Sequence, residues 1–538
     1  MKKIFLAIFV LASISSYSQN KKDYSFSYNT DSILTNGLRS YYNEKYDDAV
    51  KEYQKISKYD DKYLVAQYEI GLALSAAGKK EELRKHFEDL YNNGSMKEKP
   101  IMYTSYGSFL SDEKEYDKAE KIFEEGAIYM SNSSNFLYNQ GILYLRKGDL
   151  QKSVDILKKV VTINPNLASA HYFLGSLALE NGNVTEGTLA LLSYLILNPT
   201  GRYTGETITK LNKKYGENYI TKGDLKFSES GDDFSEIETI LSNQLPLRKA
   251  YKVKSSFDDV IIRQMQAVME YTKEHKMQDG FFETTYIPWI KDLMSKNHFE
   301  AYSYYILLSL EEDLGKKLTT HKKKITAFYE SYIIKDLWNV YAKRNVNHFG
   351  KKQDVITFIE DGRPYLVGNI INGKKQGKFA LLNDNGNIIG ELNLENDELH
   401  GKQIYFDEKG NVDLERNFKN GKLDGEVKEF ENGKLSTVEN YKDGKLHGLS
   451  TTFYGNGSKR CELNFTEGER NGTLTCYYAD GTKSSEVVYN NGKLDGKYVI
   501  YNEVGDITYT ANYKNDLLEG NYQQFFDGKV LKAEATYK

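Results

Sequence analysis

The sequence predicts an α+β multidomain protein with an N-terminal all-α superhelix, a helical middle domain and a C-terminal all-β solenoid, or meander, of stacked hairpins. Two glycine periods predict this class. Towards the N-terminus glycine recurs every 34 to 36 residues, a spacing typical of stacked helix pairs. In the last third it recurs every 23 or 24 residues, with a second glycine series in between. Each unit there holds two turns and therefore two strands.

The two periods and the segment between them set the expected domain boundaries. We assign residues 31–215 to the helical array, 216–350 to a helical connector domain and 351–538 to the β-hairpin array. At 538 residues the chain is too long for one ordinary core. Repeats relax that limit because each unit packs mainly against its neighbours.

The first 20 residues have the layout of a secretory signal peptide. Lys2 and Lys3 precede an apolar run that ends near Ile14, and small residues lead to Gln19. The run is too short to remain as a membrane-spanning helix, although an uncleaved anchor is the alternative. We therefore expect an exported protein in the periplasm, with an extracellular or outer-membrane-associated location as the alternative.

The charge balance argues against two classes of partner. The chain carries 72 basic and 76 acidic residues, a net charge of -4, and has no polybasic field for nucleic acid. The β array alone holds 25 basic and 30 acidic residues. We therefore expect no direct electrostatic binding to a membrane.

The helical array is marked by one glycine and one large side chain in each unit. The glycines are Gly37, Gly71, Gly107, Gly141 and Gly175. Sixteen residues after each glycine stands a large side chain: Tyr53, Phe87, Phe123, Leu157 or Leu191. Four residues before each of these comes a small or aliphatic residue, so the two share one helical face. The glycine allows the first helix of a unit to pack closely against the second.

These recurring positions resemble the tetratricopeptide repeat over five units, roughly residues 32–200. The pattern departs from the family at the tryptophan position, which is never Trp here, and by a two-residue insertion near residues 95–100. The resemblance implies a right-handed superhelix whose concave face holds an extended peptide or a helix of another protein. The alternative is a spacer, or a surface that docks the neighbouring domain. Residues 206–215 are expected to form a capping helix.

The middle segment begins with a polar connector at residues 222–233 and then returns to helical patterning. Apolar blocks at residues 260–271, 299–310 and 325–341 predict three to five packed helices. Trp289 and Trp338 lie here with other aromatic residues, and we interpret them as core residues in preference to a ligand cleft. The histidines of this segment show no metal-ligand spacing.

The β array is marked by Gly377, Gly401, Gly425, Gly448, Gly472, Gly496 and Gly520. Large side chains recur at fixed offsets from both glycine series, which predicts ladders along the sheet that form its core. Asn-Gly and Asp-Gly pairs supply the positive φ needed where the chain reverses.

Segments such as residues 420–425, 443–448 and 491–496 make the array similar to the MORN repeat, in its bacterial variant form often described as antitoxin-like. The resemblance covers about seven units and a leading half. Asp397 and Asp516 replace the first glycine of their turns. MORN repeats have been linked to membranes and to protein assembly, so the resemblance implies a repeat type more than a function.

Two residue pairs in the β array invite a chemical interpretation. Cys461 and Cys476 are the only cysteines and flank one turn, so they are candidates for a disulfide across adjacent strands, with two small buried thiols as the alternative. His400 and His447 occupy the same turn position, and we interpret them as polar turn residues in preference to metal ligands or a pH switch.

No catalytic motif, phosphate-binding glycine loop or metal-ligand pattern stands in the sequence, so we expect no enzyme activity, no cofactor and no metal. The leading hypothesis is an exported scaffold or adaptor that holds protein partners on two repeat surfaces. The alternatives are a toxin-neutralising, immunity-like protein and an envelope glycan-binding protein that uses exposed tyrosines. Partner identity is not encoded in any pattern that we find.

Overall fold

The computed structural model describes residues 28–217, 221–228, 231–334, 337, 340, 343–360, 363–383, 385–407, 410–526 and 530–538. The predicted signal peptide and Trp338 lie outside these residues. The chain divides into two compact units, one up to Leu110 and one from Ser111 onward. None of the helices in the described part of the chain is both long enough and apolar enough to cross a membrane.

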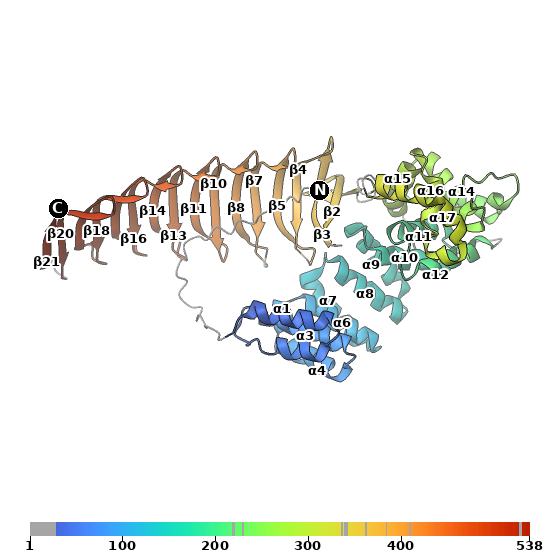
Figure 1. Cartoon of the computed structure of the whole chain (residues 1–538), viewed down its shortest axis with the longest axis horizontal. Helices are drawn as coiled ribbons and strands as arrows, with labels where there is room; N and C mark the ends of the chain where they lie inside the picture. The colour runs from blue at the N-terminus through green and yellow to red at the C-terminus, as the bar shows by residue number, and fades with distance from the viewer. Residues whose placement is uncertain are drawn as a thin grey trace. The chain divides into compact units, whose positions relative to one another are not determined.

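The first unit is built from paired helices (Figure 1). They are α1 (Thr30–Tyr42), α2 (Tyr46–Tyr53), α3 (Tyr63–Ala76), α4 (Lys80–Asn92), the short α5 (Ser95–Glu98) and α6 (Ile101–Asp112), whose last residues enter the second unit. A Cβ added at Gly37 would lie 2.3 Å from the ring of Tyr53, so α1 and α2 pack too closely there for any side chain. The glycine of this unit, Gly37, therefore contacts the large residue Tyr53, as the repeat pattern predicts.

The second unit continues the helical pairs. Its first helices are α7 (Tyr116–Met130), α8 (Ser134–Lys147), α9 (Leu150–Ile163), α10 (Ala168–Glu180), α11 (Val184–Leu197) and α12 (Thr204–Tyr215). A Cβ at Gly175 in α10 would lie 2.7 Å from Leu191 of α11, which repeats the contact seen at Gly37. Left-handed glycines such as Gly148, with a φ of 88°, end helices in this region.

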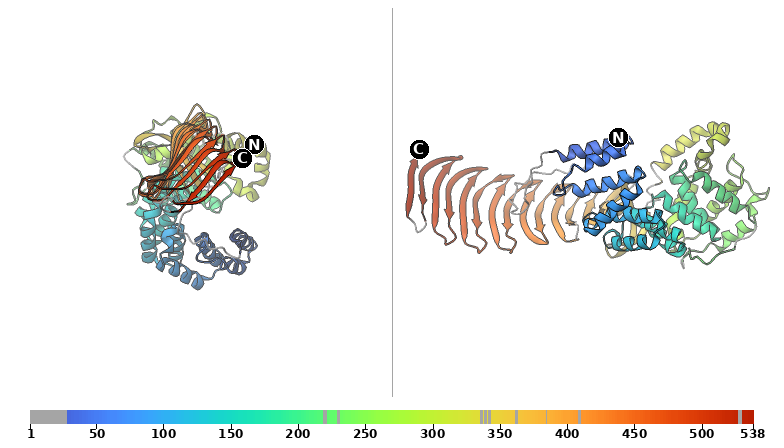
Figure 2. Two further views of the ribbon diagram at one scale, coloured as in Figure 1. Left: turned by 90° about the vertical axis from the view of Figure 1, so that its left-hand side faces the viewer. Right: turned by 90° about the horizontal axis from the view of Figure 1, so that it is seen from below.

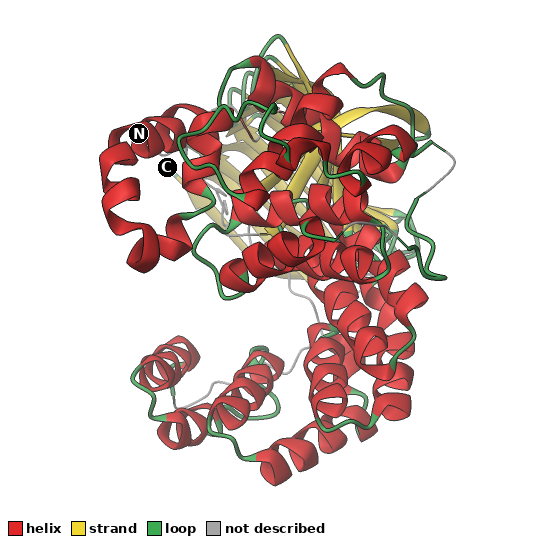
Figure 3. Ribbon diagram, turned by 90° about the vertical axis from the view of Figure 1, so that its right-hand side faces the viewer, coloured by secondary structure: helices red, strands yellow, loops and turns green. Residues whose placement is uncertain are grey.

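The middle segment adds further helices to the same body, drawn as helices joined by loops in Figure 3. They are α13 (Ser235–Ser242), η1 (Leu245–Leu247), α14 (Val260–Glu274), α15 (Phe281–Ser295), α16 (Phe299–Tyr305), η2 (Leu308–Leu310), α17 (Glu311–Phe328) and the single π-helical turn η3 (Tyr329–Ile333). The side chains of Phe282, Tyr286 and Trp289 are fully buried, which confirms the core interpretation for these aromatic residues.

The middle helices share a core with the last repeat helices instead of standing apart as a connector. Nearly every residue of α11 is buried. Trp289 of α15 donates to Ser193 Oγ at 3.1 Å, and Tyr302 of α16 donates to the Leu192 carbonyl at 2.9 Å. The last repeat pair therefore docks the neighbouring domain, so its α11 face is closed to any other protein.

The C-terminal part is one open antiparallel sheet (Figure 2). Its strands are β1 (Lys343–His348), β2 (Lys351–Glu360), β3 (Arg363–Ile371), β4 (Lys374–Leu382), β5 (Ile388–Glu395), β6 (Glu398–Leu399), β7 (Gly401–Phe406), β8 (Val412–Lys419), β9 (Lys422–Leu423), β10 (Gly425–Glu431), β11 (Lys434–Lys442), β12 (Lys445–Leu446), β13 (Gly448–Phe453), β14 (Lys459–Thr466), β15 (Glu469–Arg470), β16 (Gly472–Tyr477), β17 (Lys483–Asn490), β18 (Lys493–Tyr501), β19 (Ile507–Lys514), β20 (Leu517–Phe525) and β21 (Leu531–Tyr537). The long strands pair in sequence order, and the two-residue strands extend the hairpins.

The turns along one edge of this sheet are linked from unit to unit. The Gly421 amide donates to the Leu399 carbonyl at 2.9 Å, and the Gly444 amide repeats this with Leu423 at 2.8 Å. Asp516 stands where other units have glycine and adopts a φ of 69°. Its carboxylate accepts from the Leu494 amide at 2.7 Å, a contact that glycine does not offer and that offsets the backbone strain.

Candidate protein-interaction surfaces

Three half-buried aromatic side chains from successive elements gather on one face of the second unit's helices. They are Tyr138 of α8, Phe173 of α10 and Tyr203, which caps α12, and we call them the aromatic patch. The ring centres of Tyr138 and Phe173 are 6.3 Å apart, and those of Phe173 and Tyr203 are 5.7 Å apart. Aromatic side chains with one open side are typical of protein interfaces.

Charged residues border the aromatic patch on its α12 side. Tyr203 stacks on Tyr172 with ring centres 4.2 Å apart, and Lys210 Nζ lies 5.3 Å from the Tyr172 ring centre. Lys210 also pairs with Glu206 at 3.1 Å and Glu180 at 3.5 Å. Hydrogen bonds from Tyr172 and Lys210 hold the pKa of the Glu206 carboxyl below its usual value. Glu206 is therefore an anion at neutral pH, and this border carries both signs of charge.

The polar border continues towards the start of the second unit. Arg146 at the end of α8 donates to Ser111 at 3.1 Å and pairs with Asp112 at 2.5 Å. The guanidinium of Arg146 is hydrogen-bonded to the hydroxyl and paired with the carboxylate, so this end of the face carries polar groups of both charges. Such a surface fits a polypeptide partner better than a uniformly charged polymer.

The two faces of the β array differ in chemistry. On one face each repeat glycine lies directly across from a large side chain on the next strand. The pairs are Gly377 with Leu394, Gly401 with Phe418, Gly425 with Tyr441, Gly448 with Phe465, Gly472 with Tyr489, Gly496 with Tyr513 and Gly520 with Tyr537. These glycines have φ values between 71° and 137°, which glycine adopts most readily, and the large side chains opposite them line one face and form its thin core.

This ladder face becomes rich in tyrosine near the C-terminal end. Tyr498 and Tyr522 lie directly across from Ala511, which is 1% exposed, and Tyr509 lies 5.4 Å from each of the two rings. The hydroxyls of Tyr509 and Tyr513 are 3.1 Å apart. Burial is the first cause that raises the pKa of the Tyr509 hydroxyl. These rings form a half-exposed tyrosine cluster.

The opposite face of the β array carries a repeated charged motif. Lys459 pairs with Glu462 at 2.9 Å, and Tyr477 from the next unit donates to the same carboxylate at 2.9 Å. Lys483 and Glu486 repeat this arrangement 24 residues later. The lysine, followed by the tyrosine, lowers the pKa of the Glu462 carboxyl. Each acid is therefore neutralised within the sheet, and the face presents balanced charge.

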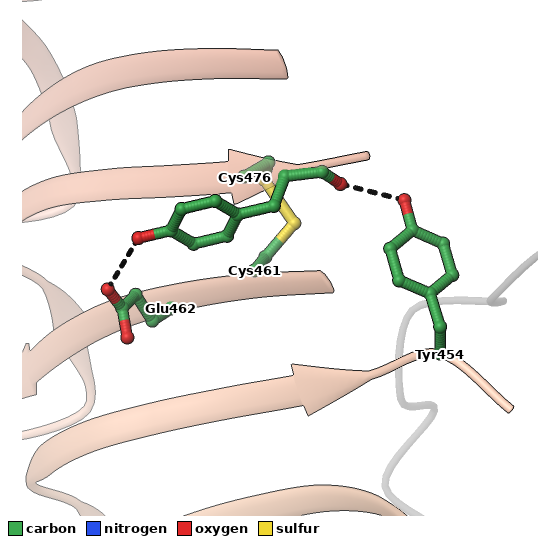
Figure 4. The surroundings of a disulfide bond; sticks show 5 residues. Tyr454, Cys461, Glu462 and Cys476 are labelled. Atoms are coloured by element: carbon green, nitrogen blue, oxygen red, sulfur yellow. Dashed lines mark hydrogen bonds between the residues drawn. A yellow bond between two sulfur atoms is a disulfide. The ribbon is translucent and has the colours of Figure 1, made fainter. Parts of the chain in front are cut away.

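Cys461 and Cys476 lie directly across from each other on β14 and β16 and are joined by a disulfide (Figure 4). Their Cα atoms are 4.0 Å apart. Tyr454 spans the same seam by donating to the Tyr477 carbonyl at 2.8 Å. The bond staples two neighbouring hairpin units together.

The remaining candidate sites, which are the two turn histidines and a surface depression, show no arrangement of groups typical of a functional site among the described residues. His400 lies 3.2 Å from Glu395, and His447 lies 3.8 Å from Glu467. Within the described residues, no group of three or more His, Cys, Asp or Glu side chains is arranged to hold a metal ion. An open depression of about 610 Å³ at strands β1 to β3 is lined mainly by aliphatic and asparagine residues, with the ion pair of Lys343 and Asp354 at its side.

The aromatic patch was not found from the sequence. Tyr138 and Phe173 sit in helices that the glycine period predicts, but the period marks only the residues that pack inside a unit. Tyr203 lies in a loop with no repeat position. Tyr138 lies three residues before Gly141 and Phe173 two residues before Gly175, so no common helical spacing pointed to the patch.

Two family models match parts of the chain. The tetratricopeptide repeat matches residues 138–201, and the MORN repeat variant matches residues 399–420. No curated protein matches the chain.

Several solved structures resemble the helical part. MamA from Desulfovibrio magneticus RS-1 is 16% identical, with 32% of this chain and 97% of that chain covered and a TM-score of 0.27. PilF of Pseudomonas aeruginosa is 14% identical, with 35% and 88% covered and a TM-score of 0.28. A tetratricopeptide protein of Thermus thermophilus is 14% identical, with 35% and 98% covered and a TM-score of 0.28.

The recurring glycine contacts, the open antiparallel sheet and the two matched segments lead to one conclusion. The chain carries tetratricopeptide repeats in its N-terminal half, matched at residues 138–201, and a MORN repeat variant near residue 400, matched at residues 399–420.

Proposed function

We propose that the protein is a non-enzymatic scaffold that binds a protein partner through the aromatic patch on α8, α10 and α12. The observation that carries the proposal is the patch itself. Three aromatic rings from successive elements lie side by side and half-exposed, whereas Trp289 of the same body is fully buried. A bordering lysine and two glutamates supply directional polar contacts. Aromatic anchors with a charged rim are the arrangement that supplies most binding energy in protein interfaces.

The test is affinity isolation with the full chain and matched variants. The double variant Phe173→Ala and Tyr203→Ala removes two anchors, and because both rings also contact the buried Tyr172, circular dichroism checks that the fold is kept. Ile128 of α7 is 78% exposed, so Ile128→Ala is a matched control for loss of a surface hydrophobe. We expect a stoichiometric partner with wild type and with the control, and at least about tenfold weaker binding with the double variant. Equal recovery with all three chains would refute the role of the patch.

We also propose that the chain works outside the inner membrane, where the disulfide of Cys461 and Cys476 persists. The apolar N-terminal run supports the same location. Cell fractionation with mass spectrometry of the N-terminus tests this. We expect the chain in the periplasmic or outer-membrane fraction with its N-terminus near Gln19. A cytoplasmic chain that keeps Met1 would overturn the proposal.

A second candidate function is glycan binding by the tyrosine cluster of the β array. Tyr498, Tyr509 and Tyr522 gather on a face that carries no charged side chain between β18 and β21 among the described residues. Neutral aromatic and amide groups fit an uncharged sugar surface. Cosedimentation with purified cell-wall material, compared with Tyr498→Ala, tests this function. Wild type that stays in the supernatant would exclude it.

A further inference from the structure

A strap formed by residues 221–228 crosses the ends of two successive helix pairs. The Gly223 amide donates to the Asn181 carbonyl at 2.7 Å, and the Leu225 amide donates to Asn181 Oδ1 at 3.2 Å. The Lys226 amide donates to Gln151 Oε1 at 2.8 Å. Asn181 follows α10, whereas Gln151 lies in the first turn of α9. The strap therefore ties together two neighbouring repeat units.

The strap also lies flat against the array. Gly182 has a φ of 87°, and a Cβ there would meet the Thr221 carbonyl oxygen at 2.0 Å. Phe227 of the strap is 1% exposed. Backbone contact at one end and a buried ring at the other show that the strap is a packed part of this body.

Two carboxyl groups meet beneath the strap, one from α11 and one from α13. Glu186 is 1% exposed, and its Oε1 accepts from Asn183 at 2.9 Å and from Ser228 of the strap at 2.5 Å. Glu238 pairs through Oε2 with Lys222 of the strap at 2.9 Å. The second oxygen of each carboxyl, Glu186 Oε2 and Glu238 Oε1, is buried and has no hydrogen-bond donor. Buried acceptors of this kind normally have a donor.

The local charges do not balance without one more proton. The charged groups that face this pair are Glu186 on α11, Glu238 on α13 and Lys222 on the strap. One lysine cannot neutralise two carboxylates, and it contacts only one of them. Burial, followed by the charge of Glu186, raises the pKa of the Glu238 carboxyl, whereas Lys222 opposes this shift. Paired carboxyls in such surroundings hold a proton between them.

We propose that Glu186 and Glu238 share one proton. This proton holds the strap against the helical array, so that a rise in pH releases the strap. The proton supplies the missing donor for both orphaned oxygens. When it is lost, the buried Glu186 carboxylate and the largely buried Glu238 carboxylate repel each other beneath the strap. Both of them hold strap residues, so when repulsion moves the carboxylates apart the contacts of Ser228 and Lys222 are loosened together. The strap then no longer sets the angle between the two helix pairs that it crosses.

The direction of the pH dependence follows from linkage. Burial beneath the closed strap raises the pKa of the Glu238 carboxyl above its ordinary value of 4.5, and opening removes part of that burial, so the closed strap binds the proton more tightly. Strap stability is therefore complete at low pH and falls as the pH rises from that value towards the raised pKa. One proton changes the opening equilibrium by at most about tenfold per pH unit.

Hydrogen exchange on the full chain tests the proposal. The amides of Gly223, Leu225 and Lys226 report strap opening, after correction for the intrinsic effect of pH. In wild type we expect their protection to fall by up to about tenfold per pH unit as the pH rises above the ordinary pKa of Glu238. Glu238→Gln replaces the shared proton with a permanent amide donor. Its protection should stay constant over the same range.

The matched control is Glu236→Gln, which removes an exposed carboxylate from the same helix. It should keep the pH dependence of wild type. Protection in wild type that does not change with pH, or that falls equally in Glu238→Gln, would overturn the proposal.

Two measurements on wild type alone keep the idea testable if the variant misfolds. Infrared spectroscopy should show a protonated carboxyl band that disappears as the strap opens, and its absence would count against a shared proton. Addition of Ca²⁺ or Mg²⁺ at high pH should leave protection low. Restored protection would mean that a cation, and not a proton, occupies the pair.

Discussion

Removal of the disulfide should loosen one seam of the β array and leave the rest of the chain intact. The bond joins residues 15 positions apart in sequence. Closing a loop of that size stabilises the folded state by about 3 kcal/mol through the entropy of the unfolded chain. Because each hairpin unit contacts mainly its neighbours, this loss should stay local.

Hydrogen exchange of the full chain with and without a reductant measures this effect. Amides in β14 and β16 should exchange about a hundredfold faster after reduction, which corresponds to about 3 kcal/mol of opening free energy. The double variant Cys461→Ser and Cys476→Ser should match the reduced protein. Amides in α14 and α15 are the internal control and should not change.

The result that would refute this reasoning is equal exchange in the oxidised and reduced chains. It would mean that the paired strands hold the seam without help from the bond. Faster exchange throughout the β array would contradict the expectation that the loss of stability stays local, since it would show that the array unfolds as one cooperative block.

The remaining predictions concern close packing and turn geometry. Gly175→Ala should lower the free energy of unfolding by about 1 to 3 kcal/mol because its Cβ would overlap a leucine of α11, whereas Gly205→Ala, with open space around it, should not destabilise the chain in thermal unfolding. Trp289→Phe and Ser193→Ala should each destabilise the helical body, and a double-mutant cycle should show a coupling of about 1 kcal/mol if their hydrogen bond matters. Asp516→Ala should speed exchange in the last two hairpins because alanine disfavours the φ of 69° and accepts no hydrogen bond, whereas Asp516→Asn should remain close to wild type.

Much of the architecture could be predicted from the sequence because the same residue spacing recurs in every repeat, and that spacing fixes which residues meet. Gly37 and Tyr53 are 16 residues apart and meet as the helical spacing predicts. In the β array the glycine series predicted two strands per unit and the placement of large side chains along the sheet. A local rule that recurs at a fixed period is easier to detect than a contact that occurs once.

Contacts between segments far apart in the chain have no such signal. The bond from Trp289 to Ser193 joins residues 96 positions apart, and no periodicity connects them. The docking of the middle helices on α11 was considered only as an alternative use of the array. The structure shows that this docking buries the last repeat pair. The aromatic patch escaped prediction for the same reason, since Tyr203 belongs to no repeat.

The sequence by itself determined the two repeat types and the handful of positions where only glycine or a large side chain fits. Those features depend on short-range spacing along helices and strands. Only the tertiary structure decided which faces stay open, that Glu186 and Glu238 meet beneath a strap, and which oxygen atoms lack a donor there. Burial and charge balance depend on how distant segments pack together, and the order of residues along the chain does not state that packing.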